Sequence, residues 1–170
     1  MPERKVILVD EKDNPLGTGE KLKTHQEGKL HRAFSIFVFN SKGELLLQKR
    51  ARGKYHSGGL WTNTCCSHPE PDKNLKAEAE KRLQEEMGFT CDLKEISSFV
   101  YKAGLGDLIE YEFDHVFSGK FDGNPEPDKT EAEDWKWINL TELKQDVKDS
   151  PEKYTYWFKA ILEKGFVGKC

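Results

Sequence analysis

The chain has 170 residues and a formal net charge of −3, with 34% of its residues charged and 36% hydrophobic. This length and balance fit one globular domain over residues 1–170, and the slight acidic excess disfavours a nucleic-acid-binding protein. Apolar runs of a few residues fall far short of the roughly 20 that cross a bilayer, and no signal-peptide pattern begins the chain, so we expect a cytoplasmic monomer without membrane partners.

The first part of the chain predicts strands joined by turns. In chain order we expect a short strand at 6–9, a turn-rich segment at 10–19, strands at 33–39 and 44–50 forming a hairpin across the turn 40–43, a polar, glycine-rich loop at 51–59 and an extended segment at 61–68.

A helix follows, and both of its ends are marked in the sequence. Asp72 or Asn74 can cap the N-terminus, and Gly88 can stop the helix after Met87. Apolar residues four positions apart mark its buried face, namely Leu75, Ala79, Leu83 and Met87.

The rest of the chain predicts strands at 97–101, 108–117 and 135–138, then helices at 141–147 and 151–164. Strands stand on both sides of the central helix, and the chain closes with helices. This order indicates an α/β (α+β sandwich) fold with a mixed β-sheet flanked by helices.

Two adjacent cysteines and a histidine lie in the extended segment. Side chains alternate along an extended chain, so Cys66 and His68 share one face and Cys65 points to the other. Cysteines are common in ordinary cores, but this spacing also lets one thiol meet a substrate beside a metal or a base. The chain has no CxxC pair, so we do not expect a structural zinc site.

The strand at 108–117 alternates cleanly between two kinds of side chain. Ile109, Tyr111, Phe113, His115 and Phe117 face one way, and Glu110, Glu112 and Asp114 face the other. Acidic residues on one face of a strand commonly face solvent. Alternatively, two carboxylates roughly 7 Å apart along a strand can hold a cation or raise the pKa of one of them.

Three histidines and two of these carboxylates form a candidate metal site. His25 and His31 flank a loop ahead of the first core strand. Together with His68, Glu110 and Glu112 they offer a donor set that suits a six-coordinate divalent ion such as Mn²⁺, Mg²⁺ or Zn²⁺. His56 and His115 have no comparable support, and we interpret them as structural.

Charged residues on the helix and around the hairpin suggest an anion site. Glu78, Arg82 and Glu86 recur every four residues, with Glu85 beside them, which fits an exposed ion-pair ladder. They equally fit a phosphate held by Arg82, with its Mg²⁺ on Glu86. Lys21, Arg50 and Lys54 lie on either side of the hairpin and would suit a phosphate or diphosphate ligand.

Taken together, these segments resemble the type 1 isopentenyl diphosphate isomerases of the Nudix-fold superfamily. The resemblance covers about residues 6–166 and rests on EKLKTH…LHRAFS, LLLQKRARGK, GLWTNTCCSHP, RLQEEMG and IEYEFDHVF. The Nudix box usually reads REUxEExGU, with U apolar, but residues 81–89 read KRLQEEMGF. Replacement of the leading Arg-Glu pair by Lys81 and Arg82 counts against ordinary Nudix diphosphate hydrolysis.

The resemblance implies conversion of isopentenyl diphosphate to dimethylallyl diphosphate in isoprenoid biosynthesis. It implies that Cys66 is the catalytic thiol, that Glu112 is both the opposing acid–base group and a metal ligand, and that Tyr101 hydrogen-bonds Glu112. The other implied roles are diphosphate contacts at Lys21, Arg50, Lys54 and Arg82, metal ligation by His25, His31, His68, Glu110 and Glu112, a second Mg²⁺ with the diphosphate at Glu86, and a hydrocarbon pocket lined by Trp157. The segment 21–31 would close as a lid.

Two alternative functions remain at this point. One is a Nudix-type diphosphohydrolase, and the other is a non-catalytic metal- or ligand-binding domain on the same scaffold. The sequence also leaves open which metal occupies the site and which of Cys66 and Glu112 gives the proton. The acidic segment 122–134 and the tail 167–170 carry no functional signal.

Overall fold

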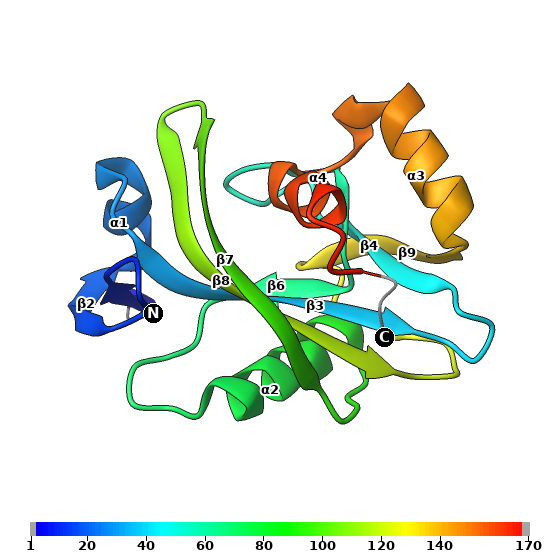
Figure 1. Ribbon diagram of the computed structural model, residues 1–170, viewed down its shortest axis with the longest axis horizontal. Helices are drawn as coiled ribbons and strands as arrows, with labels where there is room; N and C mark the ends of the chain where they lie inside the picture. Colours follow the sequence, from blue (N-terminus) through cyan, green and yellow to red (C-terminus); the bar gives the residue numbers. More distant parts are fainter. Residues whose placement is uncertain (1–2, 168–170) are drawn as a thin grey trace.

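A computed structural model describes residues 3–167, so most of the tail, 168–170, lies outside the described residues (Figure 1). The elements in chain order are β1 (Lys5–Val9), β2 (Pro15–Glu20), α1 (Lys21–Glu27), β3 (His31–Phe39), β4 (Leu45–Arg50), β5 (Trp61–Thr62), β6 (Cys65–Ser67), α2 (Leu75–Met87), β7 (Lys94–Leu105), β8 (Leu108–Lys120), β9 (Ala132–Ile138), α3 (Leu140–Asp149), a 3-10 turn (Pro151–Lys153) and α4 (Tyr156–Glu163). Within residues 3–167, no helix is long and apolar enough to span a membrane.

A mixed sheet forms the middle layer, and β3 is its central strand. β3 pairs in parallel with β8 and antiparallel with β1, β4 and β6. Helix α2 covers one face of the sheet, and α3 and α4 lie over the other (Figure 1). This arrangement confirms the predicted α+β sandwich with a mixed sheet.

Two hydrophobic clusters hold the layers together, one on each face of the sheet. The cluster under α2 contains Phe34, Ile36, Leu83 and Met87, and it includes Cys65. The cluster under α4 contains Phe37, Leu47, Trp157, Phe158 and Ile161, with Cys66 packed against it. The two adjacent cysteines therefore point to opposite faces, as the alternation of an extended chain predicts.

Helix α2 has the ends that the sequence predicts. The Asn74 side chain accepts a hydrogen bond from the backbone N–H of Ala77 at 2.9 Å, which satisfies one free donor of the first turn. Gly88 ends the helix with φ of 76°, and its N–H donates to the carbonyl of Gln84. Beyond this stop, the N–H of Glu126 donates to the carbonyl of Met87 at 2.9 Å, so the segment before β9 lies against the helix end.

Gly88 should be more sensitive to substitution than Gly43, although both have φ of 76°. A Cβ at Gly88 would lie 2.3 Å from the Glu126 carbonyl oxygen, whereas a Cβ at Gly43 would have no atom within 4 Å. We expect Gly43→Ala to cost about 1–2 kcal/mol from left-handed backbone strain alone, and Gly88→Ala to cost clearly more. Urea unfolding of the two variants checks this, and equal losses would contradict the steric explanation.

Three predicted regions differ from the structure. The segment 10–19 is not only turns, because Pro15–Glu20 pairs antiparallel with β1. The loop expected around His25 is helix α1, which ends at Gly28 with φ of 65°. The predicted helix 151–164 is interrupted after the 3-10 turn. Tyr154 is extended and bridges Trp61, and the N–H of Thr155 donates to the Trp61 carbonyl at 3.0 Å, so tertiary pairing overrides helix propensity there.

The remaining boundaries shift by a few residues. The extended segment 61–68 forms the two short strands β5 and β6, and the strands predicted at 97–101, 108–117 and 135–138 extend to Lys94–Leu105, Leu108–Lys120 and Ala132–Ile138. The β7–β8 hairpin is consequently long, and strand β8 runs close to α1 at one end of the sheet (Figure 1).

Candidate active site

Strand β3 separates the two groups of candidate residues and fixes their spacing. On one side it pairs with β6, with Ser35 opposite Cys66. On the other side it pairs with β8, with His31 opposite Glu112. The thiol and the carboxylate therefore come from the two neighbours of one strand. Both line a single pocket of about 210 Å³.

Three imidazoles converge on the Glu112 carboxylate. One oxygen of Glu112 lies 3.0 Å from His68 Nε2, 3.5 Å from His31 Nε2 and 3.8 Å from His25 Nε2. Strand β8 supplies the carboxylate, and β3, helix α1 and the chain just beyond β6 supply the imidazoles. The structure thus brings together four of the five residues of the predicted metal set, whose ligand atoms all lie within 4.8 Å of one another.

The hydrogen bonds around these imidazoles suit a cation. His25 Nδ1 lies 2.7 Å from the Lys21 carbonyl and His31 Nδ1 lies 2.9 Å from the Lys29 carbonyl, so in both rings Nδ1 carries the hydrogen and Nε2 presents a lone pair. His25 Nε2 is buried and has no hydrogen-bond partner among the described residues. The Nε2 lone pairs and the Glu112 carboxylate are all electron-pair donors without a hydrogen between them. A divalent ion bound at their centre would accept these electron pairs.

Burial and the three imidazoles act in opposite directions on Glu112. Burial alone would raise the pKa of its carboxyl group, but the close contacts with His25, His31 and His68 outweigh burial and hold the pKa well below its usual range. Burial lowers the pKa of His68 to about 3, against the pull of Glu112. The site therefore contains a charged carboxylate beside a neutral His68, which are the forms that bind metals.

Glu110 stands next to this cluster and is joined to it by Tyr101. The Tyr101 hydroxyl lies 2.7 Å from one oxygen of Glu110 and 2.6 Å from one oxygen of Glu112. The ligand atoms of Glu110, His25 and His56 lie within 4.8 Å of one another, but Glu110 is not part of the cluster that joins Glu112 to His25, His31 and His68. The acidic face of β8 is buried, not solvent-exposed. Asp114 continues that face and accepts a hydrogen bond from Ser35 at 2.7 Å.

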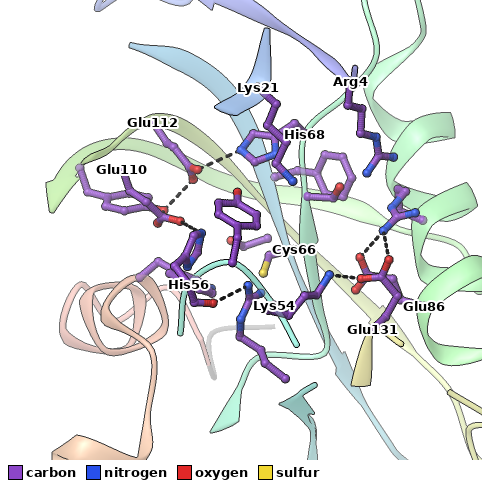
Figure 2. A pocket seen from close by; sticks show the side chains of 18 residues that line it. Arg4, Lys21, Lys54, His56, Cys66, His68, Glu86, Glu110, Glu112 and Glu131 are labelled. Atoms are coloured by element: carbon purple, nitrogen blue, oxygen red, sulfur yellow. Dashed lines mark hydrogen bonds and ion pairs between the residues drawn. The ribbon is translucent and has the colours of Figure 1, made fainter. Parts of the chain in front are cut away.

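Cys66 lies between the cluster of histidines around Glu112 and a group of cations (Figure 2). Burial raises the pKa of its thiol, and the positive charge of Arg50 only partly opposes this effect. Cys66 therefore keeps its proton at neutral pH while Glu112 is charged. Together the two groups hold one transferable proton across the pocket.

The predicted anion-binding residues line the same pocket. These residues are Lys21, Arg50, Lys54 and Arg82. Burial, together with the charges of Arg4 and Lys54, lowers the pKa of Lys21 to about 8, because several cations share a small space. Such a group of partly buried cations favours an anion with several negative charges.

Glu86 lies apart from the histidine cluster, on the α2 side of the pocket (Figure 2). Arg82 donates to one of its oxygens at 2.6 Å, and Gln48 and the Cys65 thiol donate to the other at 3.2 and 3.4 Å. The exposed-ladder interpretation of this helix face is wrong, because Glu78, Arg82 and Glu86 are at most 8% exposed.

Comparison with known proteins identifies the family. The sequence profile of the NUDIX domain matches residues 29–158. Isopentenyl-diphosphate Delta-isomerase 2 of Aromatoleum aromaticum is 56% identical over 163 residues, covering 95% of this chain and 86% of that protein. Isopentenyl-diphosphate Delta-isomerase 2 of Photorhabdus laumondii is 56% identical over 158 residues, covering 92% and 89%. This chain belongs to the isopentenyl-diphosphate Delta-isomerase family.

Solved structures share the fold of this member of the isopentenyl-diphosphate Delta-isomerase family. The crystal structure of DR0079 from Deinococcus radiodurans superposes with a TM-score of 0.73 at 15% identity, covering 86% of this chain and 90% of that one. The MutT protein of Methanosarcina mazei Go1 superposes with a TM-score of 0.65 at 18% identity, covering 79% and 91%. At this identity the likeness concerns the fold alone.

Among the residues that line the pocket of this isomerase-family chain, sequence reasoning missed the charged side chains of Arg4 and Glu131 and the imidazole of His56. Glu131 forms ion pairs with Lys54 and with Arg82, so the segment 122–134 does contribute to the pocket. His56, which the sequence leads us to interpret as structural, lines the pocket, and its Nε2 lies 2.9 Å from Glu110. No local periodicity marks these positions, and only tertiary contacts reveal them. His115 does lie away from the pocket, between Asp13 and Glu95.

Proposed function

We propose that this chain converts isopentenyl diphosphate to dimethylallyl diphosphate. In this 1,3 shift one proton adds to the terminal CH₂ carbon, a tertiary carbocation forms, and one proton leaves C2 as the double bond moves. The reaction requires a group that gives a proton and a group that takes one, set apart around the hydrocarbon. The observation that carries the proposal is that Cys66 and Glu112 line one pocket and hold a single transferable proton between them.

In this proposal Tyr101 and Trp157 assist the acid–base pair. The Tyr101 hydroxyl, 2.6 Å from Glu112, orients that carboxylate and stabilises its charge. Trp157 is almost fully buried and lines the pocket, where its ring can face a cationic centre. Cation–π attraction of this kind contributes about 2 kcal/mol or more when the partners are desolvated. Exclusion of water by these side chains protects the cation from capture as an alcohol.

The proposed metal ligands are His25, His31, His68, Glu112 and Glu110, with Mn²⁺, Mg²⁺ or Zn²⁺ as the ion. When bound, the ion supplies positive charge that fixes the Glu112 carboxylate and tunes its affinity for a proton. The Nε2 of His25, which has no hydrogen-bond partner within residues 3–167, and the convergence of three imidazoles on one carboxylate oxygen support this assignment.

The diphosphate belongs to the basic side of the pocket. Lys21, Arg50, Lys54 and Arg82 are its proposed contacts, and Glu86 is the proposed ligand of a Mg²⁺ bound with it. The Arg50 guanidinium lies 5.2 Å from the centre of the Trp157 ring, so the diphosphate contacts and the hydrocarbon pocket adjoin.

We further propose that residues 1–170 form one domain, which acts as a monomer in the cytoplasm. Its proposed partner is a small-molecule prenyl diphosphate, and we do not expect it to bind nucleic acid or a membrane. Two hydrophobic clusters that share one sheet support a single cooperative unit.

An assay in D₂O with isopentenyl diphosphate tests the function. We expect dimethylallyl diphosphate that carries deuterium in a methyl group, without release of phosphate, because the added proton comes from an exchangeable group. Phosphate release without isomerisation would favour the diphosphohydrolase alternative. Metal binding without either reaction would favour a non-catalytic binding domain.

A further inference from the structure

The loop between β4 and β5 folds over the pocket and inserts one imidazole into it. His56 Nε2 lies 2.9 Å from an oxygen of Glu110, and both side chains are at most 7% exposed. The His56 ring meets the Trp157 ring edge-on, with centroids 5.7 Å apart. His56 thus touches both the carboxylate side and the hydrocarbon side of the pocket (Figure 2).

The neighbours of His56 determine which of its nitrogens carries the hydrogen. A carboxylate only accepts hydrogen bonds, so Nε2 donates to Glu110. On the other side of the ring, the Ser57 hydroxyl lies 3.3 Å from Nδ1 and can donate to it. The ring therefore gives one hydrogen bond from Nε2 to Glu110.

Backbone strain in this loop accompanies the placement of His56. Ser57 has φ of 53°, in the left-handed region that non-glycine residues rarely adopt. A Cβ at Gly58 would lie 2.7 Å from the carbonyl oxygen of Arg52, so the loop is wound closely on itself. Arg50 donates to the backbone carbonyl of His56 at 3.2 Å and holds the turn in place. Strain of this kind persists where the surroundings require one conformation.

Contacts on both oxygens of Glu110 restrain its carboxylate. The Tyr101 hydroxyl, which Glu110 shares with Glu112, lies 2.7 Å from one oxygen, and His56 Nε2 lies 2.9 Å from the other. The ligand atoms of His25, His56 and Glu110 lie within 4.8 Å of one another, so this carboxylate stands at the edge of the histidine cluster. Outer hydrogen bonds of this kind orient metal ligands and strengthen metal binding.

We propose that His56 is a positioning residue that orients the Glu110 carboxylate toward the metal, an inference that rests on the metal site of the proposed function. Its Nε2–H restrains one oxygen of Glu110, and its ring packs against Trp157 and keeps the loop closed over the pocket. His56 does not itself need to bind the metal or exchange a proton with the substrate.

The test compares Mn²⁺ affinity in the full-length chain and its variants, by titration of the Mn²⁺-loaded protein with a chelator. His56→Phe keeps a ring beside Trp157 but loses the hydrogen bond, and it should bind Mn²⁺ about 10- to 100-fold more weakly. His56→Gln keeps an N–H donor near the position of Nε2 and should recover most of the affinity. His115→Phe, on the same strand as Glu110 but outside the pocket, should bind as the unchanged chain does.

Two further readouts separate positioning from general damage. Isomerase activity lost in His56→Phe at limiting Mn²⁺ should return at excess Mn²⁺. In a Glu110→Gln background, His56→Phe should have little additional effect on Mn²⁺ affinity, because the two residues act through one contact.

The outcomes distinguish this inference from the function on which it rests. Undiminished Mn²⁺ affinity in His56→Phe would overturn the role of His56 while leaving the isomerase intact. The same holds if His56→Phe lowers the Mn²⁺ affinity equally in the original chain and in the Glu110→Gln background. Absence of Mn²⁺ binding in the unchanged chain would overturn the proposed metal site and the role of His56 together.

Discussion

Replacing Cys66 by Ala should lower kcat for isomerisation about 10²- to 10⁴-fold, the usual contribution of a positioned proton-transfer group. The thiol is buried in the pocket and keeps its proton, so its loss removes one of the two groups that we propose to exchange protons with the substrate. The loss should appear in kcat with little change in KM, because the cations proposed to bind the diphosphate remain. Steady-state kinetics with isopentenyl diphosphate measures both constants.

Cys65→Ala is the matched control, since it removes the adjacent thiol from the opposite face of the strand. Cys65 packs in the cluster under α2, and its thiol donates to Glu86, whereas Cys66 lines the pocket. We expect its kcat to stay close to that of the unchanged chain. Equal losses in the two variants, or no loss in Cys66→Ala, would remove Cys66 from the mechanism.

Glu112→Gln should lower kcat by a similar or larger factor, at least about 10²-fold, and should also weaken Mn²⁺ binding. One of its oxygens lies within 3.0–3.8 Å of three histidine nitrogens, and the other accepts from Tyr101. A neutral amide keeps the shape but removes the charge that both a metal and a proton require. Isomerase kinetics and chelator titration of the Mn²⁺-loaded variant measure the two effects separately.

Two comparisons define the result expected for Glu112. Cys66→Ala should lose activity but retain Mn²⁺, because the thiol is not among the residues grouped around the carboxylate. Tyr101→Phe should keep more activity than Glu112→Gln, since it removes only a hydrogen bond. Full Mn²⁺ affinity in Glu112→Gln would contradict the assignment of this carboxylate as a ligand.

Local patterns in the sequence predict those parts of the fold and site that depend on neighbouring residues. Alternation along an extended chain separates Cys66 from Cys65, and it sets Glu110 and Glu112 on one face of β8. The cap at Asn74 and the stop at Gly88 are equally local. The roles of these site residues stay predictions until the variants are measured.

The remaining features depend on contacts between distant parts of the chain. The acidic face of β8 is buried because β8 pairs in parallel with β3. The two strands are distant in the sequence, as the hydrogen bond between Ser35 and Asp114, 79 residues apart, illustrates. His56 stands in a glycine-rich loop without periodicity, and only folding of that loop onto Glu110 reveals it. Tyr154 leaves the helical conformation because it pairs with Trp61, a contact that no local propensity encodes.

The position of β3 between β6 and β8 also bears on how this protein can change over evolution. Backbone hydrogen bonds of the sheet, with Ser35 opposite Cys66 and His31 opposite Glu112, set the distance across the pocket. The chain can therefore gain or lose residues at the Gly43 or Gly106 turns without moving the thiol relative to the carboxylate. A single deletion within β3 would instead exchange the faces of every following side chain in that strand. Length variation among descendants should accumulate in the turns and be absent from this strand.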